Sequence, residues 1–279
     1  MSSSTGENKK RNTVIDETLD EMFEYTGSGQ IVPKDVVVVR FHSSIVEVEE
    51  NAFKDCISLK EVVLNDGLKK IGSNAFDDCK ALQSITIPPS LLEIGGGAFR
   101  FCSNLKRVEL NEGLQKIGRH SFYQCNIESI ICPPSLVGIG ACAFQGNIHM
   151  KKVVLNNKLR IIGSGAFSGC KSISTIEIPS NVVIISSASF DGCTQLRKVV
   201  LNEGHKKIGA EAFQDCKALE RIVLPSTVTT IGWHAFKLCT NLKRVVLNNG
   251  LRTMGKGAFQ ECLSLERITI PPSFNPLQP

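Results

Sequence analysis

The chain has 279 residues, of which 42% are hydrophobic, and its charged side chains leave a net charge of +5. This length is enough to bury a sizeable core, and the mild positive charge permits many kinds of partner without requiring any of them. The sequence contains no run of apolar residues long enough to cross a bilayer, so no membrane-spanning helix is expected.

The first 35 residues are interpreted as a polar tail followed by a capping element. Residues 1–23 lack the apolar segment of a secretory signal, which favours a cytoplasmic location. In the segment TVIDETLDEMFEY (residues 13–25) the apolar side chains recur at helical spacing, so we expect a short amphipathic helix there. This helix would cover the first coil of the repeat that follows, because repeat solenoids need caps at their ends. A docking peptide for another protein is the alternative.

From residue 36 onward a unit of about 23 residues is repeated ten times. Each copy carries a Phe: Phe53, Phe76, Phe99, Phe122, Phe144, Phe167, Phe190, Phe213, Phe236 and Phe259. One interval has only 22 residues, because a residue is missing between Cys125 and Ile127. Before each Phe lies the pattern apolar-x-x-apolar-x-apolar, as in LKEVVL (residues 59–64), with a weaker first copy in residues 36–41. Such segments predict short strands, and stacked copies predict one parallel β-sheet over a continuous interior.

Two kinds of turn alternate after these strands. Odd coils carry Asn-x-Gly or a close relative, as in NDG at residues 65–67, and even coils carry Pro-Pro-Ser or similar, as in PPS at residues 88–90. Both chemistries bend the chain off the sheet. A shorter apolar piece then ends in Ile-Gly, and its recurrent Gly, such as Gly72, predicts either a positive φ or a close backbone approach. Ser186 stands at this position in one coil.

These features together resemble the BspA-like, or Treponema-type, leucine-rich-repeat family. The family pattern LxxIxIPxxvxxIGxxAFxxC is matched almost letter for letter by LERIVLPSTVTTIGWHAFKLC at residues 219–239. The resemblance implies a right-handed solenoid over residues 36–273, with residues 274–279 as a C-terminal tail. It also implies a binding function, in the family often that of a cell-surface adhesin, and it brings no catalytic residues.

The cysteines follow the repeat. Nine of the eleven lie three residues after a repeat Phe: Cys56, Cys79, Cys102, Cys125, Cys170, Cys193, Cys216, Cys239 and Cys262. Asn147 replaces the thiol in one coil. Disulfides would leave each thiol with two equivalent neighbours, and the CxxC or CxxH spacings of metal sites do not occur. We therefore interpret these residues as small buried hydrophobes, and so many free thiols favour a reducing compartment.

Catalytic and cofactor-binding motifs do not accompany the repeat. The five His residues do not recur at a fixed repeat position beside Ser, Asp or Cys, and no Gly-rich phosphate loop, HExxH or GxSxG occurs. We therefore expect a protein that is not an enzyme and that binds neither a metal ion nor a cofactor.

The outward positions of the strand pattern carry the functional prediction. The apolar letters of LxxIxI face inward, so the two residues after the first letter point away from the interior. Over ten coils these twenty positions hold eleven Lys or Arg and four Glu. The predicted site, called the basic stripe below, consists of the pairs in odd coils: Lys106, Arg107, Lys151, Lys152, Arg197, Lys198, Lys243 and Arg244.

Two interpretations of the basic stripe stay open at this point. It is either a solvated surface in which Glu220 and Glu266 neutralise neighbouring strands, or the binding site of an acidic protein or similar polyanion. Nucleic acid is disfavoured because the stripe lacks aromatic residues on which bases could stack. The sequence thus predicts a non-enzymatic protein-interaction scaffold, with a cell-surface adhesion module of a larger protein as the alternative.

Overall fold

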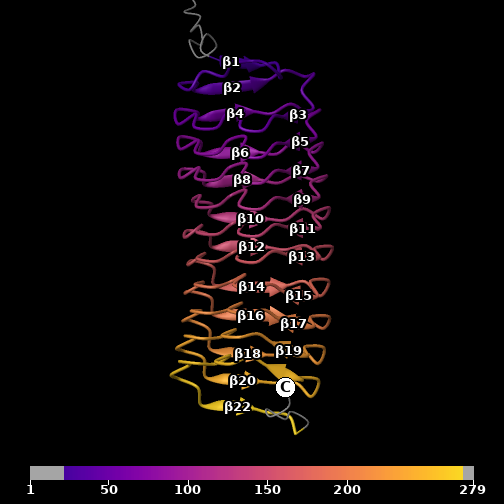
Figure 1. Cartoon of the computed structure of the whole chain (residues 1–279), viewed down its shortest axis with the longest axis vertical. Helices are drawn as coiled ribbons and strands as arrows, with labels where there is room; N and C mark the ends of the chain where they lie inside the picture. Colours follow the sequence, from indigo (N-terminus) through magenta and orange to yellow (C-terminus); the bar gives the residue numbers. More distant parts are fainter. Residues whose placement is uncertain (1–21, 273–279) are drawn as a thin grey trace, which may run out of the picture.

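The computed structural model of the chain describes residues 22–272, which form one solenoid whose coils follow one another along the long axis (Figure 1). Each repeat contributes a strand of three or four residues to a parallel ladder, called the sheet face, and a two-residue strand to a second parallel ladder, called the short ladder. No α-helix occurs between residues 22 and 272. The predicted repeat solenoid is confirmed, and the short apolar piece before each recurrent Gly proves to be a strand of its own.

Two sets of strands build these ladders. The sheet face consists of β1 (Met22–Tyr25), β2 (Val38–Phe41), β4 (Glu61–Val63), β6 (Ser84–Thr86), β8 (Arg107–Glu109), β10 (Ser129–Ile131), β12 (Lys152–Val154), β14 (Thr175–Ile178), β16 (Lys198–Leu201), β18 (Arg221–Val223), β20 (Arg244–Val246) and β22 (Arg267–Thr269). The short ladder consists of β3 (Glu47–Val48), β5 (Lys70–Ile71), β7 (Glu93–Ile94), β9 (Lys116–Ile117), β11 (Gly138–Ile139), β13 (Ile161–Ile162), β15 (Ile184–Ile185), β17 (Lys207–Ile208), β19 (Thr230–Ile231) and β21 (Thr253–Met254). Paired strands place equivalent residues of neighbouring coils side by side, as Ile130 beside Val153.

The segment predicted as an N-terminal helix is a strand wherever the structure describes it. Residues 13–21 lie outside the described range, but Met22–Tyr25 forms β1 and pairs in parallel with β2. Tyr25 is buried, and its ring centroid lies 5.0 Å from those of Phe41 and Phe53. The helix prediction was wrong here because the open edge of β2 offers backbone hydrogen bonds to an added strand, and aromatic residues suit that position. A strand therefore covers the first coil.

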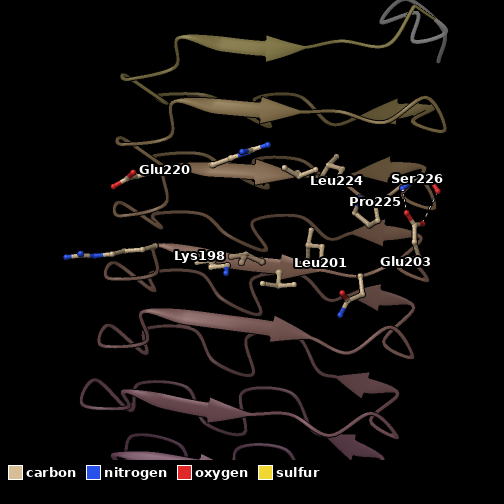
Figure 2. A pocket seen from close by; sticks show the side chains of 13 residues that line it. Lys198, Leu201, Glu203, Glu220, Leu224, Pro225 and Ser226 are labelled. Atoms are coloured by element: carbon tan, nitrogen blue, oxygen red, sulfur yellow. Dashed lines mark hydrogen bonds between the residues drawn. The ribbon is translucent and has the colours of Figure 1, made fainter.

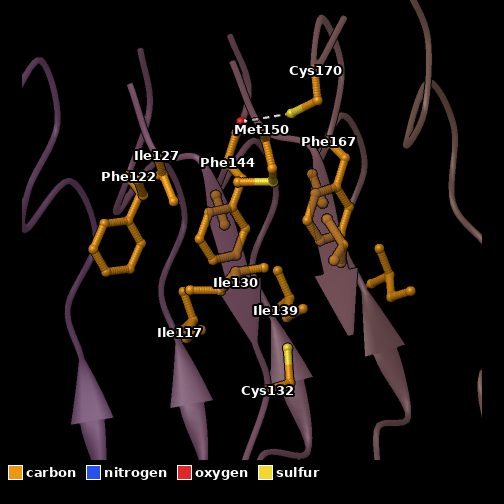
Figure 3. Close-up of a cluster of buried hydrophobic side chains, with 14 of the residues drawn as sticks. Ile117, Phe122, Ile127, Ile130, Cys132, Ile139, Phe144, Met150, Phe167 and Cys170 are labelled. Atoms are coloured by element: carbon orange, nitrogen blue, oxygen red, sulfur yellow. Dashed lines mark hydrogen bonds between the residues drawn. The ribbon is translucent and has the colours of Figure 1, made fainter. Parts of the chain in front are cut away.

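A column of phenylalanine rings runs through the interior. Neighbouring rings from Phe53 to Phe259 have centroids 5.0–5.5 Å apart and planes within 9° of parallel. This spacing follows from the distance of about 4.8 Å between adjacent strands and gives offset stacking. Figure 3 shows Phe122, Phe144 and Phe167 as successive members of the column, with isoleucines of both ladders around them. The repeat period thus sets the core.

The repeat thiols lie in the same interior, and all eleven cysteines are free. The thiol of Cys79 donates to the carbonyl oxygen of Phe53, one coil earlier, over 3.2 Å. Seven further repeat cysteines make the equivalent contact at 3.0–3.4 Å, and Figure 3 draws the one made by Cys170. Burial raises the pKa of the Cys170 thiol to about 12. The interpretation of these residues as small buried side chains is confirmed.

The recurrent Gly lies where two coils come closest together. A Cβ added at Gly72 would lie 2.6 Å from the carbonyl oxygen of Val48, a distance that real side chains do not adopt. The φ of this Gly is not positive; instead the residue two positions later, such as Asn74 or His120, has a φ near +55°. Close approach is therefore the reason for the Gly, and it sets the spacing of the short ladder.

Candidate binding surface on the sheet face

The structure places all eight residues of the basic stripe on the outer side of the sheet face, and all eight are exposed. In each pair the first residue precedes the strand and the second begins it, so the stripe consists of two adjacent columns. Within residues 22–272, none of the eight takes part in an ion pair. The neutralising partners considered from the sequence, Glu220 and Glu266, make no ion pair with them either. The positive charge of the stripe is therefore free to attract an acidic partner.

The spacing of the cations changes along the solenoid. In the middle coils, Ser129 lies directly between Arg107 and Lys152, so hydroxyl side chains separate the cations. Toward the C-terminal end, Arg221, Arg244 and Arg267 stand side by side on β18, β20 and β22. Arg221 and Arg267 belong to even coils and were not among the predicted site residues. Like charges this close together repel each other, and Glu220 and Glu266 of the same coils offset part of this positive charge.

A third outward column borders the basic stripe. It is formed by the residue between the two inward apolar letters of each strand and includes Val63, Ile131, Val154 and Val223, all of which are exposed. These residues were not among the predicted site residues, which came from the first two outward positions of the pattern. The strand alternation that reveals the third was present in the sequence, because a residue between two inward side chains must point outward. The apolar residues of this third column, called the apolar column below, lie beside the basic stripe, and Glu109 and Glu177 occupy the same position in two other coils.

The sheet face is hollowed between β16 and β18 (Figure 2). This sheet hollow has a volume of about 820 Å³, and Arg197, Lys198 and Arg221 contribute to its lining. Figure 2 shows Lys198 and Leu201 on one coil, facing Leu224 and Pro225 on the next. A second hollow of about 540 Å³ adjoins it over β12 to β16, and Lys198 lines both. Three cations of adjacent coils and the carboxylates of Glu203 and Glu220 thus surround one depression with an apolar floor.

The sheet hollow lies at an interruption of the ladder. Strands β14 and β16 form one hydrogen-bonded group, and β18, β20 and β22 form another. Val199 of β16 is only partly buried, whereas its counterparts Ile222 and Val245 are fully buried. The wider separation of these two coils opens the interior side chains of β16 to solvent, which gives the hollow its apolar floor.

His205 replaces a leucine in the turn next to the sheet hollow. Its side chain occupies the buried position that Leu159 and Leu251 hold in other odd coils, and its Nδ1 lies 2.7 Å from the carbonyl oxygen of Val182. In some odd coils the turn asparagine binds this carbonyl, as Asn248 does that of Val228 at 2.9 Å. Asn202 instead donates to Oε1 of Glu177 at 3.2 Å and to the carbonyl oxygen of Ile178 at 3.4 Å. Asn111, in the coil with Leu114 at the His205 position, likewise donates to the carbonyl oxygen of Ile87, so the shared Asn-Glu-Gly turn and not His205 accounts for this arrangement. Asn202 lines the rim of the hollow.

Glu203 fixes the opposite rim. Its carboxylate accepts the backbone N–H of Ser226 at 3.0 Å, the Ser226 hydroxyl at 2.9 Å and the N–H of Thr227 at 3.2 Å. These donors, first of all the Ser226 N–H, lower the pKa of Glu203 and keep it ionised. The negative charge is held by these three donors, so it is not directed at the cations across the hollow. The lining of the sheet hollow thus holds three cations against the carboxylates of Glu203 and Glu220.

Other kinds of site find less support in residues 22–272. This part of the chain contains no group of three His, Cys, Asp or Glu side chains placed to hold a metal ion. No helix in the same range is long and apolar enough to cross a membrane. The basic stripe, the apolar column and the sheet hollow are the features of the sheet face that a partner could recognise.

Comparisons with known proteins agree with this architecture. The family model described as BspA type Leucine rich repeat region matches residues 34–151, 115–231 and 160–279. A leucine-rich repeat protein from Bacteroides ovatus is 30% identical with a TM-score of 0.73, and the match covers 88% of this chain and 59% of that one. The T. pallidum Leucine Rich Repeat protein is 26% identical with a TM-score of 0.51, over 80% of this chain and 83% of that one. No curated protein sequence matches the chain significantly.

Proposed function

Because the chain belongs to the BspA-type leucine-rich-repeat family, we propose that it is a non-enzymatic scaffold that binds an acidic protein on its sheet face. Leucine-rich repeats in general present extended surfaces for protein interaction. One observation supports the acidic partner above all others: the eight exposed cations of the basic stripe lie in two adjacent columns without an ion pair to any residue in 22–272.

The dimensions of the stripe favour an extended partner segment. Strands about 4.8 Å apart spread the seven coils from Lys106 to Arg244 over roughly 29 Å, which is far longer than a small anion. Attraction between opposite charges would speed the encounter, and burial of the apolar column with Val154 and Val223 would contribute affinity. Nucleic acid remains disfavoured because base stacking needs aromatic side chains, which the stripe lacks. Carboxylates of the partner would enter the sheet hollow beside Lys198 and Arg221.

Charge reversal tests this proposal. In the test variant Lys151, Lys152, Arg197 and Lys198 are each replaced by Glu. The matched control reverses four exposed cations that lie off the sheet face: Lys69, Lys171, Arg252 and Lys256. Proteins captured from the native cell by the wild type and the control, but not by the test variant, support the proposal if their contact regions are acidic. Equal capture by all three, with unchanged thermal unfolding, would reduce the basic stripe to a solvated surface.

The cellular location is a separate question. The comparisons give no support to the expected cytoplasmic location, and the alternative is an adhesion module displayed at the cell surface. Protease treatment of intact cells distinguishes the two locations, because only a surface-exposed solenoid is cleaved while cytoplasmic markers stay intact. The basic stripe would serve a partner of the same chemistry in either place.

A further inference from the structure

The outer positions of the short ladder change character in the middle of the solenoid. In the first coils they carry ion pairs, Lys70 with Glu47 at 2.7 Å and Lys116 with Glu93 at 2.9 Å. The next three coils carry apolar residues or Gly at the same place. These residues, called the side patch, are Val137, Gly138, Ile161, Val183 and Ile184. The four side chains are between 42% and 62% exposed, although the fold allows charged residues there.

Two adjacent hollows make the side patch concave. One has a volume of about 470 Å³, with Val137, Gly138 and Ile161 in its lining. The other has about 270 Å³ and lies between Ile161, Val183 and Ile184. The atom nearest to a Cβ added at Gly138 would be the Cβ of Ile161, 4.0 Å away. Packing therefore does not require a Gly at this position. A side chain at position 138 would fit into the first hollow, and the Gly leaves that space open.

The short ladder is also interrupted at the side patch, between β13 and β15. Ser186 stands there in place of the recurrent Gly, and its hydroxyl donates to the carbonyl oxygen of Ile162 at 2.6 Å. Lys206 N–H donates to Val183 O at 2.8 Å in the next coil, but the equivalent bond from Val183 N–H to Arg160 O is not formed within residues 22–272. A backbone donor and a backbone acceptor therefore lie open beside the exposed apolar side chains.

The charges around the side patch indicate which partner fits it. Arg160, Lys206 and Lys207 are exposed at its edge, and none of them takes part in an ion pair within the described range. A second copy docked on the same patch would bring these cations together, which is unfavourable. An apolar segment with acidic flanks would instead satisfy both the apolar surface and its basic edge.

We propose that the side patch is a second docking surface, which binds an extended protein segment with apolar residues between Asp or Glu. Alternate side chains of an extended segment are roughly 6.6 Å apart, and adjacent coils are about 4.8 Å apart, so two apolar residues at i and i+2 can enter the two hollows. This surface is distinct from the sheet face and does not depend on the basic stripe.

A displayed library of random twelve-residue peptides tests the proposal. The bait is the variant with Lys151, Lys152, Arg197 and Lys198 reversed to Glu, so that sheet-face binders are removed. We expect selected peptides with alternating apolar residues beside Asp or Glu. Their affinity should fall at least tenfold on Ile161→Thr/Ile184→Thr, and also on Gly138→Leu, which fills the first hollow. The control Val154→Thr/Val223→Thr on the sheet face should leave it unchanged.

Three outcomes would overturn the proposal. The first is a selection that yields no peptide above background, or peptides with basic flanks. The second is binding that tolerates both side-patch variants. The third is a concentration-dependent dimer in sedimentation experiments that Ile161→Thr/Ile184→Thr abolishes, because the occupant would then be a second copy of the chain. All the substituted residues other than Gly138 are exposed, so loss of binding without loss of the native melting transition reports the patch itself.

Discussion

The side-chain oxygen of Asn147 accepts the backbone N–H of Ile127 at 3.0 Å, and its amide nitrogen donates to the carbonyl oxygens of Phe122 and Phe144, both at 2.8 Å. In a regular coil the equivalent N–H is satisfied locally, as Leu59 N–H is by Cys56 O at 3.1 Å. The 22-residue coil lacks one residue at this point, so the longer side chain of the next coil supplies the acceptor. The Asn147 side chain, which replaces the repeat thiol, therefore compensates for the residue that is missing after Cys125.

This relationship predicts the effect of restoring the repeat thiol. Asn147→Cys should lower the free energy of unfolding by about 1–3 kcal/mol, because the buried N–H of Ile127 loses its acceptor. The matched control is the same variant with one Ser inserted after Cys125, which restores a full-length coil and should recover most of the loss. Urea unfolding measures both. An Asn147→Cys protein as stable as the wild type would show that the N–H finds another partner.

The extent to which the sequence predicts this fold depends on how far apart the interacting residues are. The Phe column follows directly from a spacing of 23 residues, since equivalent positions of adjacent coils must stack. The strand β1 was missed because the 16-residue step from Tyr25 to Phe41 does not match the repeat and local spacing favoured a helix. The role of Asn147 could not be predicted, because it depends on a residue absent from a different coil.

The candidate site also has features that the sequence predicts and features that it does not. Alternation within each strand predicted correctly that the basic stripe is exposed, because that property is local. The sheet hollow depends on the missing pairing of β16 with β18. This is a relationship between two neighbouring coils, and no residue of the repeat pattern indicated it.

His205→Leu should stabilise the protein. Nε2 of His205 is buried and has no hydrogen-bond partner, and a leucine or valine fills this position in the other odd and even coils. The substitution removes the unsatisfied atom, and the coil with Leu114 shows that a leucine fits this position beside the same Asn-Glu-Gly turn. We therefore expect a gain of about 1 kcal/mol in urea unfolding. A less stable variant would contradict this account.

Ser186→Gly should close the interruption of the short ladder. With a Gly, the two coils can approach as they do at Gly72, and Val183 N–H can then donate to Arg160 O. Hydrogen exchange of the Val183 amide should slow at least tenfold, since an exposed amide becomes a ladder donor.

The reciprocal control for Ser186→Gly is Gly209→Ser. A Cβ at Gly209 would lie 2.6 Å from the backbone nitrogen of Ser187, so this variant should separate β15 from β17 and speed exchange at Lys206. Unchanged exchange at both amides would show that the residue at this position does not set the spacing of the coils.

The thiols should differ sharply in reactivity. Burial raises the pKa of Cys132 and of Cys170 to about 12 and that of Cys262 to about 11, so at pH 8 these groups remain protonated and shielded. Cys142 is the single cysteine that is not buried. Iodoacetamide at pH 8 should therefore modify one of the eleven thiols of the native protein rapidly, Cys142→Ser should abolish that reaction, and all thiols should react in urea. Rapid labelling of a second thiol in the folded protein would mean that the coils open locally and expose the interior column.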